Sequence, residues 1–138
     1  MATARDLGIA DVPFLADIDL TAKQYYFVMV ASTLGNITTA TGASNPAPIG
    51  VLQNAPSLGQ EARVRVLGFT KLVGEATTCN LTYGKFFYSS SDGQAQPIIT
   101  AAGSPICGTW LDATLSSGSA IGQALFLPSW GACAISAS

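Results

Sequence analysis

The chain has 138 residues, of which 49% are hydrophobic and only 10% are charged, with a formal net charge of -2. This length suits one domain with a hydrophobic core of its own. Six Lys and Arg residues are too few for the clustered basic surface that phosphate binding requires, so no nucleic-acid partner is expected.

Charged residues make up about 25% of an ordinary soluble domain, so the exterior of this chain must be covered mainly by uncharged polar residues. Neighbouring molecules with such a surface repel each other little, because they carry few charges. The surface also costs little free energy to desolvate when another protein docks on it. The composition therefore favours a structural role in an ordered assembly.

The residue types that carry most enzyme chemistry are scarce. The chain has no His, and its three cysteines, Cys79, Cys107 and Cys133, include no close pair. We therefore predict buried thiols rather than a metal site or a disulfide framework. A Ser or Cys nucleophile would lack its usual base, and no phosphate-binding glycine motif is present. We expect a non-enzymatic protein without catalytic residues or cofactors; a small hydrolase is the weakest alternative.

Residues 1–22 contain four Asp residues and Pro13 but no sustained period, which predicts an extended N-terminal arm ahead of a single β domain at residues 23–138. Within the arm, Asp11–Ala22 is the one weak candidate for a helix. The N-terminus lacks a secretory pattern, and the longest apolar stretch, Tyr25–Ala31, is too short to cross a bilayer. We expect a product made and kept in the cytoplasm until assembly, with no membrane partner.

The segment Tyr25–Ala31 is rich in aromatic and β-branched residues, so it predicts a first buried strand. The following segment, Leu34–Pro48, is rich in Thr, Gly, Asn, Ala and Pro. This composition predicts a long loop, which we interpret as a contact surface.

The clearest strand signal is Glu61–Val66, where apolar and charged residues alternate. Gly68 then shifts the phase before Phe69, as a β-bulge or a bend at a barrel corner would. Short apolar runs separated by turn residues continue to the end of the chain. This spacing predicts an all-β sandwich or barrel of short strands.

Four further strands are expected in the second half. Lys85–Tyr88 and Gln94–Thr100 flank Asp92-Gly93 and form a plausible hairpin, because Asp-Gly accepts positive φ angles. Pro97 places the return strand at an edge or at its own start. Ile106–Leu111 and Ile121–Leu127 supply two more strands.

The run GVLQNAPSLGQEARVRVLGFTKLV at residues 50–73 resembles the capsid cement, or head decoration, family of tailed phages. The later segments Tyr83–Gly93, Gly108–Leu111 and Ala120–Pro128 are similar to that family's pattern of a turn, a strand and a closing apolar strand before Pro. The resemblance covers residues 48–130.

This resemblance implies a compact β-barrel or β-tulip domain, with a jelly-roll-like sandwich as the alternative found in other cement proteins. It further implies a virion protein on the capsid surface, bound to the major capsid protein and cementing neighbouring copies against internal DNA pressure. A homotrimer over local threefold positions is the first expectation, and a homodimer is the alternative. Avidity from many repeated weak contacts would suit this role.

Six residues are predicted to contact the capsid or other partners: Arg5, Leu7, Phe14, Asn36, Arg63 and Arg65. The two last arginines, with Lys71 and Lys85, could form a local positive patch that faces an acidic partner. If the arm makes the contact, deletion of residues 1–15 should abolish shell binding and leave the fold intact.

A second hypothesis is a carbohydrate-binding or adhesive β-domain of a phage head fibre or tail. In that case an exposed Trp110 or Trp130 would stack on a sugar. Quenching of indole fluorescence by glycans would favour this alternative over the cement role.

Overall fold

The computed structural model describes residues 10–42, 46–75, 81–97, 106–113 and 120–127. Regular structure in these residues consists of β-strands alone, which confirms the predicted all-β class. The strands are β1 (Ala10–Ala16), β2 (Phe27–Val30), β3 (Asn36–Thr39), β4 (Gly50–Leu52), β5 (Glu61–Val73), β6 (Phe86–Ser89), β7 (Ala95–Pro97), β8 (Gly108–Trp110) and β9 (Ile121–Phe126). The described residues contain no apolar helix of the length that a membrane crossing requires.

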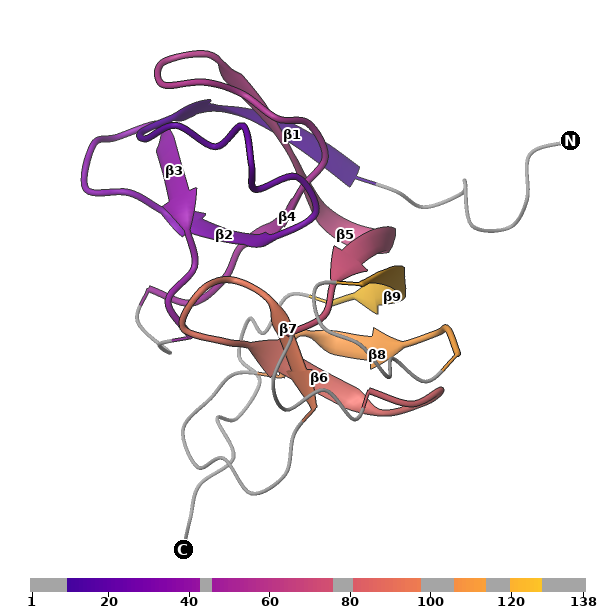
Figure 1. Ribbon diagram of the computed structural model, residues 1–138. Coiled ribbons are helices and arrows are strands. Elements are labelled where there is room, and N and C mark those ends of the chain that lie inside the picture. The colour runs from indigo at the N-terminus through magenta and orange to yellow at the C-terminus, as the bar shows by residue number, and fades with distance from the viewer. Residues whose placement is uncertain (1–9, 43–45, 76–80, 98–105, 114–119, 128–138) are drawn as a thin grey trace, which may run out of the picture.

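The first half of the chain closes into a small barrel. Its neighbours follow the cycle β1-β3-β2-β4-β5, and β5 pairs in turn with β1. Only the β1–β3 contact is parallel, where Leu15 lies opposite Asn36. Since every strand has a partner on both sides, this barrel has no open edge. It forms the upper part of the molecule in Figure 1.

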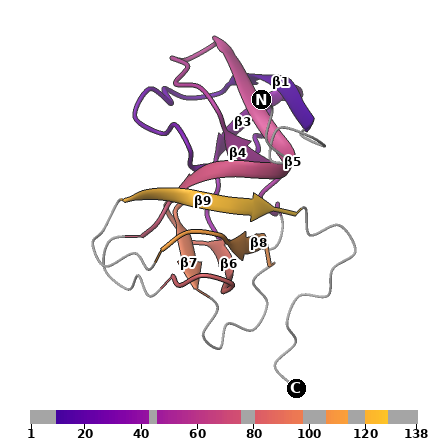
Figure 2. The ribbon, with the colours of Figure 1, turned by 90° about the vertical axis from the view of Figure 1, so that its right-hand side faces the viewer.

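The second half forms another sheet in the order β5-β9-β8-β6-β7. A parallel bridge joins Gly74, directly after β5, to Ala95 of β7. The N–H of Glu75 also donates to the carbonyl of Ala95 at 3.0 Å. These contacts bring the last strand back to the first, so a second barrel forms below the first one (Figures 1 and 2).

Strand β5 belongs to both barrels. Up to Leu67 it pairs with β1 and β4, and from Gly68 onward it pairs with β9. The register with β1 shifts between Arg65 and Leu67, which leaves Val66 as an extra residue, and Gly68 has a φ of 112°. This confirms the predicted irregularity at Gly68: the strand bends as it passes from one barrel to the other (Figure 2).

Each barrel has its own core. The first core contains seven buried residues: Ala16, Leu20, Val28, Ile37, Leu52, Ala62 and Val64. The second is more aromatic and includes Phe27, Phe87, Trp110 and Phe126. The ring of Phe27 lies 5.8 Å from that of Phe87 and 6.1 Å from that of Phe126. Successive side chains of a strand point in opposite directions. In β2, Phe27 therefore packs in the second core and Val28 in the first.

Several predicted elements are confirmed. Strand β2 lies inside Tyr25–Ala31, and β6 and β7 form the expected hairpin. The turn between them has Gly93 at a φ of 82°. Strand β7 ends at Pro97 and is the last strand in the order of the sheet, which agrees with the expected edge position; beyond β6, the bridge of Ala95 to Gly74 is the contact that closes the barrel there.

Two predictions for the first half are wrong. The segment Leu34–Pro48 is not one long loop, because it contains β3. Ile37 is the one apolar residue of that strand and is fully buried, whereas its neighbours are polar and partly exposed. Residues 11–16 of the helix candidate Asp11–Ala22 belong to β1 instead. In both segments the strand conformation is determined by pairing with other strands, and local composition does not reveal that pairing.

The described part of the predicted arm is built into the first barrel. Strand β1 pairs with β5 and β3, and Leu20 is fully buried in the first core. Deletion of residues 1–15 would therefore remove most of a barrel strand rather than leave the fold intact. Residues 1–9 lie outside the described residues.

Candidate functional site

An apolar depression at one end of the first barrel collects two of the predicted contact residues. It has a volume of about 310 Å³ and is lined by Phe14 and by residues 30–36 of the β2–β3 turn. Phe14 packs against the first core. Val30 is opposite the buried Ile37 yet is itself 45% exposed, so the core reaches the surface here. We call this depression the barrel-end groove.

The apolar surface extends beyond the groove. Leu34, at the tip of the turn, is 100% exposed, and Leu15 on β1 is 48% exposed. The N–H of Leu15 donates to the carbonyl of Gly35 at 3.1 Å, which places the two segments side by side. Single exposed apolar residues are normal, whereas several of them on neighbouring segments make this end of the barrel a candidate contact surface.

Asn36 lines the groove, but its side chain has a partner within the chain. Its amide Nδ2 donates to Oδ1 of Asp17 at 2.9 Å. This hydrogen bond connects the start of β3 to the residue after β1, beside the parallel pairing of these strands. Asn36 therefore holds the wall of the groove in place.

The predicted arginines differ in their availability. The guanidinium of Arg65 binds Asp11 through two hydrogen bonds, Nε to Oδ1 at 2.8 Å and Nη2 to Oδ2 at 3.1 Å. Its Nη1 donates to the carbonyl of Phe69 at 2.9 Å, across the bend of β5. The Arg63 side chain is 59% exposed, with its Nε 3.9 Å from Asp11. Arg65 thus stabilises the barrel, while Arg63 can reach a partner.

The predicted positive patch is weakened by the same carboxylate. Asp11 lies beside both Arg63 and Arg65, so it offsets part of their positive charge locally. Local sequence pattern does not predict this contact, because Asp11 and Arg65 are 54 positions apart. Arg5 and Leu7 lie outside the described residues.

The expected sugar-stacking role of Trp110 is wrong. Its side chain is fully buried in the second core, and its indole Nε1 donates to the carbonyl of Ala113 at 3.1 Å. The ring has no exposed face on which a sugar could stack. Trp130 lies outside the described residues.

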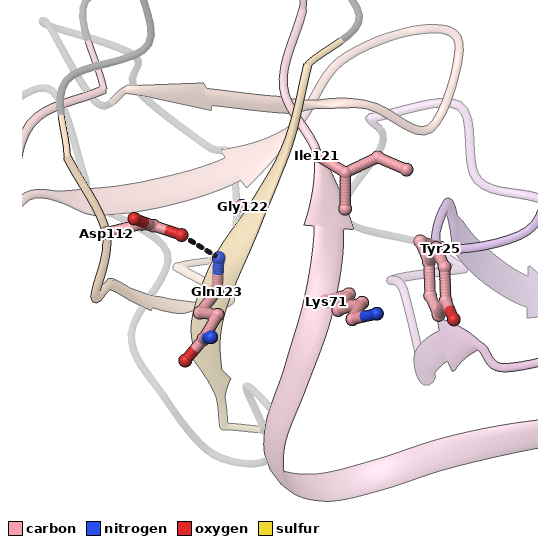
Figure 3. A pocket seen from close by; sticks show the side chains of 6 residues that line it. All are labelled: Tyr25, Lys71, Asp112, Ile121, Gly122 and Gln123. Atoms are coloured by element: carbon pink, nitrogen blue, oxygen red, sulfur yellow. Dashed lines mark hydrogen bonds between the residues drawn. The ribbon is translucent and has the colours of Figure 1, made fainter.

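A second depression of about 330 Å³ lies on the outer face of the second barrel, over β5 and β9 (Figure 3). We call it the Tyr25 groove; its lining residues are Tyr25, Lys71, Asp112, Ile121, Gly122 and Gln123. Lys71 and Gln123 are direct partners across the two strands. The ammonium of Lys71 lies 5.7 Å from the centre of the Tyr25 ring and points toward it.

Two features fix the geometry of this groove. Tyr25 has a φ of 68° and is alone among the described non-glycine residues in having a positive φ, which costs about 1–3 kcal/mol. Hydrogen bonds hold its backbone: its N–H donates to Leu52 at 2.8 Å, and its carbonyl accepts from Val73 at 3.1 Å. The Asp112 carboxylate accepts from the N–H groups of Ala113 and Gln123 at 2.8 and 3.1 Å.

No three His, Cys, Asp or Glu side chains in the described segments lie together as metal ligands would. Of the cysteines, Cys107 is described, and it is buried in the second core as predicted. Burial raises the pKa of its thiol to about 12, partly offset by a backbone hydrogen bond at Ser89. A thiol with so high a pKa is a poor nucleophile at neutral pH.

No protein-family model matches this chain, and no curated protein matches it, so the resemblance to cement proteins is not established by these comparisons. Among the solved structures, the chain is similar to the head fiber gp8.5 N base of bacteriophage phi29. The TM-score is 0.63 at 13% sequence identity, and the match covers 86% of this chain and 93% of the other. At this identity the likeness shows a shared fold.

Proposed function

We propose that this chain is a structural protein of a bacteriophage head, located on the capsid surface of the virion. The observation that carries the proposal is the fold shared with the phi29 head fiber base. Because the match extends over 86% of the chain, it takes in both barrels and not one common small barrel. Fold alone does not determine function, so the chemistry of the surface must support the same role.

In this proposal the chain acts as a cement protein. It binds the major capsid protein, associates with itself as a trimer or dimer, and stabilises the shell against internal DNA pressure. The resemblance at residues 50–73 and the low charge of 10% support this role. Each contact can be weak, because repetition over a symmetric shell gives high avidity.

The barrel-end groove is the proposed contact surface. Leu34 and Val30 in the groove, with Leu15 beside it, present exposed apolar area, and burial of such area is the main favourable term in protein association. Arg63 adds an accessible cation on the neighbouring β5. Arg5 and Leu7 remain predicted contacts from the sequence.

The second candidate function is the base of a head fibre, which the likeness to the phi29 head fiber base favours. A fibre base must attach to the shell but need not hold its subunits together. A cement protein must do both. The effect on shell stability therefore separates the two functions.

The test is to mix the purified chain with expanded empty capsids, pellet the shells and measure the bound ratio to coat protein. Light scattering of the chain alone gives its oligomeric state. Saturable binding that also raises the disruption temperature of the shells would support the cement role, and binding without that rise would support the fibre base. Absence of binding to any phage shell would contradict both.

A further inference from the structure

We propose that the Tyr25 groove is a binding site for a neutral saccharide. The site is separate from the barrel-end groove, since it lies over β5 and β9 of the second barrel and not at the β2–β3 turn. The inference therefore goes beyond the proposed capsid contact and can fail independently of it.

The first argument is the conformation of Tyr25. At a φ of 68° glycine would be unstrained, yet an aromatic residue occupies the position at the edge of a groove. Strained backbone of this kind is concentrated at binding sites and other functional sites. The Tyr25 ring packs only partly against the second core, which leaves aromatic surface for a ligand.

The second argument is the charge of the groove. Lys71 contributes one positive charge and Asp112 one negative charge, so the lining is neutral overall. A phosphate or sulfate would be attracted by the lysine but repelled by the carboxylate. A cation would be attracted by the carboxylate but repelled by the lysine. Neutral ligands with many hydroxyl groups meet neither penalty.

The third argument is the set of hydrogen-bonding groups. The ammonium of Lys71 has three donors, and the Gln123 amide supplies both donors and an acceptor. The described residues offer no hydrogen-bond partner to that amide side chain. Each oxygen of Asp112 already accepts one backbone N–H, which fixes the carboxylate and leaves further lone pairs for ligand hydroxyls.

Apolar surface completes the groove. Ile121 is 54% exposed and lies near the Tyr25 ring (Figure 3). A pyranose has apolar C–H faces as well as hydroxyl edges, so an aromatic and aliphatic wall beside polar groups suits both parts of it. A volume of about 330 Å³ accommodates one or two sugar rings.

The experiment is an NMR titration of the ¹⁵N-labelled full chain with chitotetraose, cellotetraose and maltotetraose, and with a sulfated heparin disaccharide as the charged comparison. We expect saturable amide shifts at Gly122, Gln123 and Ala113 with at least one neutral sugar. Tyr25→Ala should weaken binding at least tenfold, Gln123→Ala several-fold, and Tyr25→Phe little. Tyr83→Ala is the matched control, because Tyr83 is 75% exposed and does not line the groove.

Two outcomes would overturn the proposal. One is that none of the three neutral sugars shifts the groove amides. The other is that the sulfated sugar binds more tightly and loses its affinity in Lys71→Gln, which would make this an anion site. Gln123→Ala alters an exposed strand face and should fold normally; its unchanged capsid pelleting would show that the sugar site and the capsid contact are independent.

Discussion

Gly122 of β9 lies directly against the indole of Trp110. A Cβ atom added at Gly122 would be 2.1 Å from Cζ2 and 2.3 Å from Cη2 of that ring, and Trp110 is fully buried. We predict that Gly122→Ala lowers the free energy of unfolding by about 1–3 kcal/mol, because neither group can move without repacking the core. Urea unfolding measures the change. In a Trp110→Phe background the same substitution should cost less; an equal cost would contradict the clash.

Arg65 and Arg63 should contribute differently to stability although both lie beside Asp11. Arg65→Ala should cost about 1–2 kcal/mol, since it removes two charge-assisted bonds to Asp11 and one to Phe69. Arg63→Ala should cost less than about 0.5 kcal/mol, as expected for an exposed pair. Thermal unfolding of the two variants provides the comparison. In Asp11→Asn, truncation of Arg65 should cost less than in the parent.

The thiol of Cys107 should be inert in the folded protein. Its pKa of about 12, against an ordinary 9.0, corresponds to about a thousandfold less thiolate at pH 8. In a Cys79→Ser, Cys133→Ser background, an aromatic disulfide reagent should label Cys107 only after denaturation. Rapid labelling of the folded chain would contradict its burial.

The same thiol makes stability depend on alkaline pH. The pKa is raised in the folded state, so the stabilisation is complete below pH 9.0, where the thiol is neutral in both states. Above that pH the unfolded chain loses the proton first, and this contribution to stability should fall by up to about 1.4 kcal/mol per pH unit until pH 12. Cys107→Ala should lack this component of the slope when denaturant midpoints are compared across the range.

Leu34 should matter for assembly and not for folding. Its side chain is 100% exposed, so Leu34→Asp should leave the unfolding temperature nearly unchanged. In the pelleting assay the same substitution should reduce shell binding by tenfold or more, because it places a charge in an apolar interface. Tyr83→Asp, on the second barrel, should bind as the parent does. Equal loss in both variants would show a nonspecific effect of charge.

Local sequence pattern was sufficient for several strands. Alternation at residues 61–66 and the aromatic run before Ala31 predict β5 and β2, and Asp92-Gly93 predicts the β6–β7 hairpin. Closure of the first barrel could not be predicted, because it depends on parallel pairing of β1 with the mostly polar β3. Such pairing is determined by register and packing between distant segments.

The candidate functional surfaces, like the first barrel, could be predicted from the sequence only in part. Phe14 and Asn36 were predicted as contacts and do line one groove, and Leu34 belongs to the predicted contact loop. The internal role of Arg65 was missed, since its partner Asp11 is far away in the sequence. The Tyr25 groove was missed because a positive φ at a tyrosine has no signature in composition.

The shared strand β5 has a consequence for how the chain is made. All residues of β5 that pair within the first barrel lie before residue 68, whereas the second barrel needs β9 at residues 121–126. During synthesis the first barrel can therefore close while the rest is still being translated, and it then presents the C-terminal half of β5 as a template. Strand β9, the last of the described strands, pairs with that template, so the second barrel forms late and on a surface that is already folded.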